Sequence, residues 1–367
     1  MKKAISVLLS IIIILNFGFI TIADDEPSCS AKNMAVVDLN TGRLICSKNA
    51  YDKAPMASTT KIMTAVLLLE NADLNDEIIC TKEMVTVEGS SMGLMAGDRV
   101  HYYDLLYGMM LASGNDAANT TAISISGSKE KFVELMNEKA KQIGMTNTNF
   151  VTPSGLDDVE HYSTAYDMAK LACYAMKNEE FVKAVSSKTA KLNYGNPPYD
   201  RTLRNHNKLL SYYDECCGIK TGFTKKSGRC LVSCAKRGEK GVVCVTLNDP
   251  NDWQDHQNLL NYSLDKVELK QFEKQSVVLD VINSDEKLYA QSQDINLSLF
   301  KDDKVTFDIE YDTILIAPIK KGEIVGKVYY KINSKTVKTV NLTATNNIKE
   351  NVLKKSYLDW IKTILIQ

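Results

Sequence analysis

The chain has 367 residues, of which 44% are hydrophobic and 24% charged, a composition typical of a globular protein and not of a long disordered chain. At about 150 residues per domain, this length suggests two domains. Its 44 basic and 45 acidic residues give a formal net charge of −1, which argues against a nucleic-acid partner, because a protein that contacts many phosphates normally carries a basic surplus.

The N-terminus is typical of an exported protein. Lys2 and Lys3 precede nineteen uncharged residues, 4–22, and Ala23 then stands before an acidic residue. A basic start, an apolar segment and a small residue at its end predict a secretory signal peptide over residues 1–23. An uncleaved membrane anchor is the alternative, because roughly 20 apolar residues span a bilayer. Both interpretations export the rest of the chain.

From the leader to about residue 270 the patterns indicate strands, then helices, then strands. A hairpin is predicted at 33–48, where Asn40-Thr41-Gly42 has good turn chemistry. Apolar residues at helical spacing predict helices at 59–70, 103–112, 115–126, 129–143 and 164–176. The expected later elements are strands at 218–224, 229–235 and 241–247 and a helix at 255–267. We therefore expect an α/β domain over 31–270, with both chain ends contributing to one sheet.

After about residue 274 the composition shifts to short runs of Val, Ile and Tyr between turns that carry Lys, Asp and Gly. These runs predict a small all-β domain over 275–345, with strands at 276–282, 295–299, 305–311, 324–332 and 335–342. The last segment, 350–367, places apolar side chains on one helical face, which predicts an amphipathic helix. That helix either lies on a membrane surface or docks on the β domain.

The nine cysteines are too few for a disulfide-stabilised miniature protein, and an odd number leaves at least one unpaired within the chain. Cys230, Cys234 and Cys244 could converge with His206 on a zinc ion, but the spacing typical of a zinc site is absent. We therefore expect these cysteines to be small buried side chains.

A Ser-x-x-Lys pattern offers the first candidate chemistry. It places a hydroxyl and an amine one helical turn apart, where an amine of lowered pKa can accept the serine proton. The pattern occurs seven times, beginning at Ser58, Ser126, Ser128, Ser233, Ser263, Ser284 and Ser298. Only Ser58 and Lys61 lead directly into a strongly apolar helix, which predicts a reactive pair at a helix N-terminus that faces the interior.

Two further triplets carry matching chemistry. Ser113-Gly114-Asn115 joins two predicted helices, where a loop can present a hydroxyl and an amide together. Lys220-Thr221-Gly222 lies on a predicted strand, with an amine and a hydroxyl beside a glycine that lets a ligand approach closely. A related triplet, Lys226-Ser227-Gly228, lies between two apolar strands and indicates a turn.

The ordered set Ser-x-x-Lys, Ser-x-Asn, Lys-Thr-Gly resembles the penicillin-recognising serine enzymes. Residues 55–65, PMASTTKIMTA, resemble the nucleophile segment of the serine-type D-Ala-D-Ala carboxypeptidases, the low-molecular-mass penicillin-binding proteins. Further segments similar to that family lie at 88–94, 102–108, 111–118, 150–157, 161–165 and 218–224. The resemblance implies a β-lactamase/transpeptidase-like catalytic domain, a mixed antiparallel sheet with helices on both faces. It also implies a β-sandwich domain and a C-terminal helix on the outer face of the cytoplasmic membrane.

For the reaction, the resemblance implies that Ser58 attacks the peptide bond between two terminal D-alanines of a peptidoglycan stem peptide. Lys61 would be the general base, and Ser113 would relay protons toward the leaving nitrogen. Water would then hydrolyse the acyl-enzyme. No metal or cofactor is implied, and β-lactams, which mimic the D-Ala-D-Ala end, should acylate the same serine.

The resemblance also implies a substrate-binding set. Asn115 would bind the substrate amide, and Lys220 and Thr221 would hold its terminal carboxylate beside Gly222. The backbone N–H groups of Ser58 and Phe223 would form the oxyanion hole. Three alternatives remain open from the sequence: a serine β-lactamase, a transpeptidase, and a non-catalytic penicillin-sensing or wall-binding protein.

Overall fold

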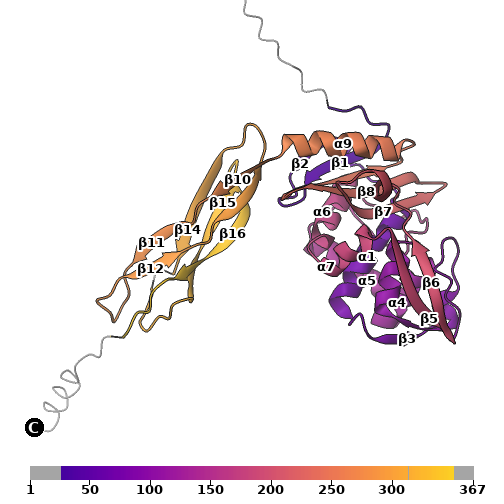
Figure 1. Ribbon diagram of the computed structural model, residues 1–367, viewed down its shortest axis with the longest axis horizontal. Coiled ribbons are helices and arrows are strands. Elements are labelled where there is room, and N and C mark those ends of the chain that lie inside the picture. The colour runs from indigo at the N-terminus through magenta and orange to yellow at the C-terminus, as the bar shows by residue number, and fades with distance from the viewer. Residues whose placement is uncertain (1–25, 313, 351–367) are drawn as a thin grey trace, which may run out of the picture.

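The computed structural model describes residues 26–312 and 314–350 (Figure 1). The predicted signal peptide, 1–23, lies outside these residues, as does all but the first residue of the predicted C-terminal helix, 350–367. Within the described residues, no helix has both the length and the apolar character needed to cross a membrane. Figure 1 shows two units, which meet where the long helix α9 runs into strand β10.

The larger unit is built on a five-stranded antiparallel sheet in the order β2-β1-β9-β8-β7. Its strands are β1 Asn33–Asp38, β2 Leu44–Lys48, β7 Cys216–Thr224, β8 Gly228–Arg237 and β9 Lys240–Leu247. The first strand pairs with the last, with Val36 opposite Cys244. Both chain ends therefore contribute to one sheet, as predicted, and β7 is left as an edge strand.

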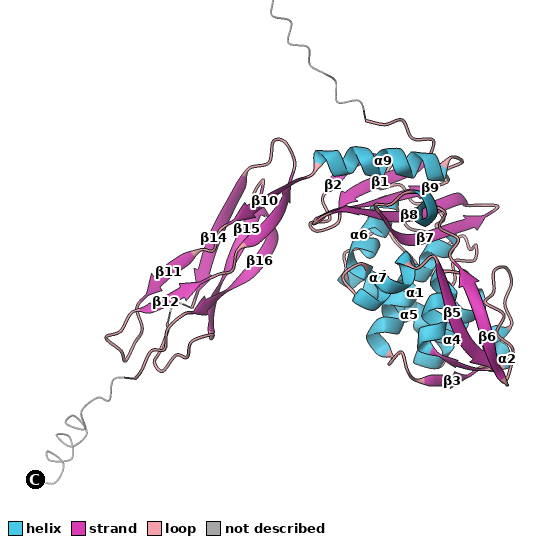
Figure 2. Cartoon of the chain, in the orientation of Figure 1, coloured by secondary structure: helices cyan, strands magenta, loops and turns pink. Residues whose placement is uncertain are grey.

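Helices cover both faces of this sheet (Figure 2). One face packs against α9, Asp252–Lys266, and the other packs against α6, Ala165–Ala175. The helical half also contains α1 Lys61–Asn71, α3 Tyr102–Met110, α4 Asn115–Ser126, α5 Lys129–Gln142 and α7 Glu179–Ser186. Every residue of α1 from Lys61 to Leu68 is buried, which makes it the central helix of this half.

Several elements were not predicted, and most of them are short. They include a four-stranded sheet of β3 Glu77–Ile79, β4 Arg99–His101, β5 Thr189–Gly195 and β6 Pro198–Arg204, and the short helices α2 Lys82–Val85 and α8 Leu209–Tyr212. The burial of β6 explains why it was missed. Its first three residues are exposed and its last four alternate between half-buried and exposed, so the apolar alternation that marks a half-buried strand is weak.

The smaller unit is all-β, as predicted. Its five-stranded sheet has the order β11-β12-β16-β15-β14, with β11 Ser276–Leu279, β12 Leu288–Gln291, β14 Val305–Tyr311, β15 Ile324–Ile332 and β16 Lys335–Ala344. A two-stranded sheet of β10 Glu268–Phe272 and β13 Ile295–Leu299 adjoins it. Arg43 of the larger unit reaches this domain, because its guanidinium pairs with Asp303 at 2.6 Å and stacks over Phe300.

Candidate active site

The turn before α1 carries Ser58. Residues Ala57–Thr60 form a 3-10 turn, so the α-helix begins at Lys61, two residues later than predicted. The Thr59 hydroxyl donates to the Met56 carbonyl at 2.6 Å, and the Thr60 hydroxyl lies 2.8 Å from His161 Nε2. These bonds fix the turn on both sides of Ser58, whose own side chain is half-buried and open to a cavity.

Lys61 is fully buried directly behind Ser58. Its Nζ donates to Ser58 Oγ at 2.9 Å, to Asn115 Oδ1 at 2.7 Å and to the Ser154 carbonyl at 2.7 Å. Burial lowers the pKa of Lys61 well below its ordinary value, and the nearby charge of Lys220 lowers it further. A neutral Lys61 amine can accept the proton of the Ser58 hydroxyl.

Burial distinguishes this pair from the other six copies of its pattern. Lys61 is 0% exposed. The lysines of the other copies are half-buried or exposed: Lys129, Lys131, Lys236, Lys266, Lys287 and Lys301. The expectation that the Ser58 copy faces the interior therefore agrees with the structure.

The Ser113-Gly114-Asn115 triplet opens α4, and both Ser113 and Asn115 are buried. Asn115 connects three parts of the site. Its Oδ1 accepts from Lys61, its Nδ2 donates to the Glu88 carbonyl at 2.5 Å, and its backbone N–H donates to the Ser90 carbonyl at 2.7 Å. Ser113 has a left-handed backbone, with φ of 58°, and its side chain lines the cavity beside Ser58.

The carboxylate of Asp116, the next residue, organises the adjoining loop. It accepts from the backbone N–H groups of Met92, Gly93 and Leu94 and from the Ser91 hydroxyl. A buried carboxylate needs several donors to offset its desolvation, and this loop supplies them. The loop is thereby held against the start of α4, with Ser90 on the cavity wall.

Strand β7 forms the opposite wall and carries Lys220, Thr221, Gly222 and Phe223. A Cβ on Gly222 would lie 3.1 Å from the backbone nitrogen of Ser58, so glycine lets this strand pass close to the nucleophile turn. Lys220 is buried, and burial lowers its pKa to about 7. Thr221 is half-buried and Phe223 is 65% exposed at the mouth of the cavity.

These residues enclose a cavity of about 310 Å³. Ser58, Ser113, Thr221, Gly222 and Phe223 line it, while Lys61, Asn115 and Lys220 lie behind its surface. The structure thus brings together all eight of the residues singled out in the sequence. The turn at 226–228 follows β7, as expected, and lies outside this lining.

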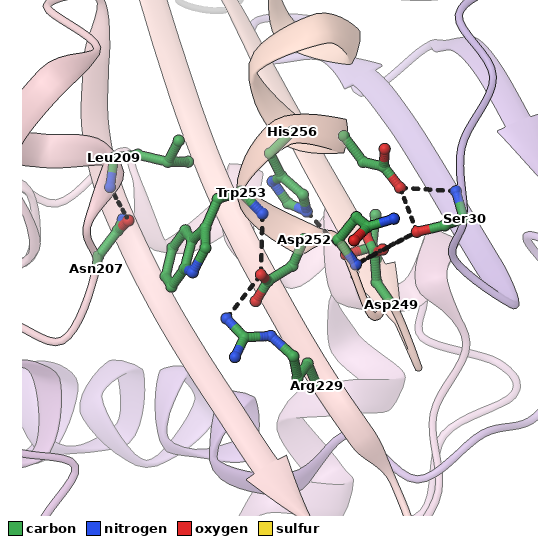
Figure 3. Close-up of polar contacts among 11 residues, drawn as sticks. Ser30, Asn207, Leu209, Arg229, Asp249, Asp252, Trp253 and His256 are labelled. Atoms are coloured by element: carbon green, nitrogen blue, oxygen red, sulfur yellow. Dashed lines mark hydrogen bonds and ion pairs between the residues drawn. The ribbon is translucent and has the colours of Figure 1, made fainter.

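Sequence reasoning missed other residues of the cavity wall: Ser90, His206, Lys208, Arg229, Asp252 and Trp253. Arg229 pairs with Asp252 at 2.7 Å, and its guanidinium lies 5.5 Å from the centre of the Trp253 ring (Figure 3). Arg229 comes from β8, and Asp252 and Trp253 come from the start of α9; no motif marks these three in the sequence. Their only signal is position, one hairpin or one helix start away from Lys220-Thr221-Gly222.

The zinc alternative for Cys230, Cys234 and Cys244 is wrong. All three are buried, but Cys230 and Cys234 belong to the core on one face of the sheet, whereas Cys244 belongs to the core on the other. They therefore cannot point at one ion with His206. In the described residues all nine cysteines are free thiols, and these three are small buried side chains, as expected.

Comparison with known families identifies the chain. Residues 20–251 match the peptidase S11 family, described as D-alanyl-D-alanine carboxypeptidase. The chain belongs to this carboxypeptidase family. Residues 268–350 match a second family, the C-terminal domain of penicillin-binding protein 5. The resemblance drawn from the motifs is thereby confirmed, as are the fold class and the assignment as a serine-type hydrolase.

Individual relatives agree with this assignment. The D-alanyl-D-alanine carboxypeptidase DacF of Bacillus subtilis is 29% identical over 99% of this chain and 100% of its own length. DacA of Haemophilus influenzae is 30% identical over 91% of this chain and 89% of its own. Among solved structures, penicillin-binding protein 5 from Haemophilus influenzae has a TM-score of 0.69 and 28% identity, covering 89% of this chain and 99% of that one.

Proposed function

We propose that this D-alanyl-D-alanine carboxypeptidase removes the terminal D-Ala of peptidoglycan stem peptides through an acyl-enzyme on Ser58. The observation that carries the proposal is the contact of 2.9 Å between Ser58 Oγ and the Nζ of the fully buried Lys61. A serine nucleophile that has no histidine base requires another base beside it, and a lysine can fill that role when its pKa is lowered, as that of Lys61 is.

In the acylation step, Ser58 Oγ attacks the carbonyl carbon of the penultimate D-Ala as its proton passes to Lys61. The backbone N–H groups of Ser58 and Phe223 stabilise the oxyanion. Ser113 relays the proton to the leaving nitrogen, and free D-Ala departs. Water then attacks the carbonyl carbon of the Ser58 ester and gives one proton to Lys61. Lys61 passes that proton to Ser58 Oγ as the ester bond breaks, and the shortened peptide leaves as its carboxylic acid.

Binding depends on charge and on the open edge of β7. Lys220 and Thr221 hold the terminal carboxylate, because a protonated Lys220 complements its charge. Asn115 binds the substrate amide, and the missing side chain of Gly222 leaves room for the substrate backbone. A β-lactam presents the same carboxylate and a strained amide, so it acylates Ser58 as a pseudosubstrate.

The β-lactamase alternative needs a carboxylate that activates water beside the ester. The acidic residues of the analogous middle region are Asp157, Asp158 and Glu160, and all three are exposed. Asp157 accepts from Thr224 at 2.9 Å, and none of the three lines the Ser58 cavity. This placement favours a long-lived penicilloyl ester over rapid turnover.

We also propose that the protein works outside the cytoplasm and rests on the outer face of the cytoplasmic membrane. The signal-peptide pattern at 1–23 supports export, and the amphipathic pattern at 350–367 supports membrane attachment. Fractionation of cells that express the full chain, and a chain that ends at residue 349, tests this. Loss of membrane association in the shortened chain supports the proposal, and unchanged association refutes it.

D-Ala release from diacetyl-Lys-D-Ala-D-Ala tests the reaction. We expect Ser58→Ala to abolish release, and Ser126→Ala, which changes another copy of the Ser-x-x-Lys pattern, to leave it at the wild-type rate. Release that survives Ser58→Ala would refute the mechanism. Addition of an amine acceptor separates transpeptidation, because the acceptor then appears in the product.

A further inference from the structure

A second cluster of reactive side chains lies behind the active-site wall, where residues 29 and 30 contact the corner between β9 and α9. The Sγ of Cys29 and one carboxylate oxygen each from Asp249 and Asp255 lie within 4.8 Å of one another. Asp249 is 0% exposed, Asp255 is buried and Cys29 is half-buried. Figure 3 shows Ser30 bonded to Asp249 at this corner.

Hydrogen-bond donors reach two of the carboxylate oxygens in this cluster. Ser30 Oγ lies 2.8 Å from Asp249 Oδ1 and 2.7 Å from Asp255 Oδ2, and the Asn251 N–H also donates to Asp249 Oδ1, at 3.2 Å. The Ser30 N–H also donates to Asp255 Oδ2, at 2.6 Å. Asp249 Oδ2 is buried and has no hydrogen-bond partner in the described residues.

In the described residues, no cation is paired with either carboxylate of the cluster; the Lys48 ammonium nearby donates to the Cys29 carbonyl, at 3.0 Å. None of the ion pairs found in the described part of the chain includes Asp249 or Asp255. Two adjacent buried carboxyls without a cation are costly, because each loses its hydration and the two repel each other. An unpartnered, fully buried carboxylate oxygen beside a thiol and a second carboxylate is the arrangement that a bound cation would complete.

We propose that Cys29, Asp249 and Asp255 form a binding site for a divalent metal ion of the zinc class. The thiol decides the class, because sulfur ligands select zinc-like ions, whereas magnesium and calcium take oxygen ligands alone. Three protein ligands leave the fourth tetrahedral position for Ser30 Oγ or water.

The geometry allows this with small movements. Zinc bonds of about 2.0–2.3 Å place tetrahedral ligand atoms roughly 3.3–3.8 Å apart. The three atoms already lie within 4.8 Å, so side-chain rotation can close the site around an ion. Cys29 binds as the thiolate and releases one proton to solvent, while Asp249 and Asp255 bind as carboxylates. Burial raises the pKa of the free Cys29 thiol to about 12, so the metal must displace that proton.

The site would fasten distant parts of the chain together, because Cys29 is separated from Asp249 by most of the catalytic unit. The same corner also supports the active-site wall. The Asp249 N–H donates to the carbonyl of Arg229 at 2.9 Å, and both Arg229 and Asp252, three residues after Asp249, line the Ser58 cavity. Metal binding would therefore stabilise the corner without taking part in the Ser58 reaction, and the inference does not depend on that mechanism.

Metal uptake by the purified, chelator-treated protein tests the proposal. We expect one equivalent of Zn²⁺ to bind in competition with a chromophoric chelator and to raise the melting temperature. We also expect Co²⁺ to give a thiolate-to-cobalt charge-transfer band. Cys29→Ser should remove the band and weaken Zn²⁺ binding at least about tenfold, a loss seen even for changes outside the ligand shell. Cys216→Ser, at another half-buried thiol, is the matched control and should bind as wild type does.

Asp255→Asn separates ligation from folding. We expect it to weaken Zn²⁺ binding while penicillin acylation continues, which shows that the variant is folded. The proposal is refuted if wild type takes up no Zn²⁺, or if Cys29→Ser binds as tightly as wild type. If the protein binds no Zn²⁺ and Asp249 and Asp255 titrate as a coupled pair, then a proton shared between the two carboxylates takes the place of the metal ion. That result would equally refute the metal site.

Discussion

Replacing Lys220 by methionine should stabilise the protein while it destroys substrate binding. Lys220 is 1% exposed, and its Nζ donates to the Thr221 carbonyl at 3.0 Å. Burial lowers its pKa from 10.5 to about 7, so at lower pH the folded protein must hold a buried charge. At about 1.4 kcal/mol per pKa unit, this shift costs about 5 kcal/mol of folding free energy.

The cost depends on pH in a defined direction. It is fully present below pH 7, where both the folded and the unfolded chain carry the charge, and it vanishes as pH rises through the unfolded value of 10.5. Methionine removes the charge but also a hydrogen bond worth about 1 kcal/mol. We therefore expect Lys220→Met to gain about 4 kcal/mol at pH 6 and about 1 kcal/mol at pH 9. The charge of Lys220 also lowers the pKa of Lys61, so its removal gives some further relief.

Urea unfolding at pH 6 and pH 9 measures both values, with the transition of the catalytic unit followed by tryptophan fluorescence, to which Trp253 contributes. Lys225→Met is the matched control, because Lys225 is exposed in the turn that follows β7. We expect this control to change stability by less than about 0.5 kcal/mol at either pH. A Lys220→Met protein no more stable than wild type at pH 6, or a gain that does not shrink at pH 9, would refute the reasoning.

Two further results are expected. The pH profile of kcat/KM should be bell-shaped, falling at acid pH as Lys61 becomes protonated and at alkaline pH as Lys220, with a pKa of about 7, loses its charge. Because a bound carboxylate favours protonated Lys220, the alkaline limb of kcat should lie at higher pH, and coincident limbs would contradict this role. Gly155→Ala should slow penicillin acylation of Ser58 and cost several kcal/mol, since its Cβ would lie 2.0 Å from a backbone carbonyl oxygen. Gly127→Ala, with a similar φ and open space around it, should cost only about 1 kcal/mol, and equal losses in urea unfolding would disprove the steric explanation.

The catalytic motifs were predictable because they are local. Ser58 and Lys61 stand one turn apart in an apolar helix, and that context separated them from the six other copies. The hairpin at 33–48 and the strands before α9 were predictable for the same reason, since apolar alternation and turn residues lie close together in the chain. The family resemblance then joined the three motifs into one site.

What could not be predicted depends on contacts between distant residues. The pKa of Lys61 depends on burial beneath Asn115 and the Ser154 carbonyl, which the spacing of the motif does not show. The pairing of Arg229 with Asp252 joins a strand to a helix start. The cluster around Cys29 needs partners more than 200 residues away, as its bonds from Ser30 to Asp255 show. No periodicity contains that information.

Mass spectrometry of the protein after incubation with benzylpenicillin tests the central claim most directly. We predict a single penicilloyl adduct on the peptide that contains Ser58, persistent over many minutes, and absent from Ser58→Ala and Lys61→Met. The Lys61 variant matters because it keeps the hydroxyl and removes only the base. An adduct on another residue, or undiminished acylation of the Lys61→Met protein, would contradict the account.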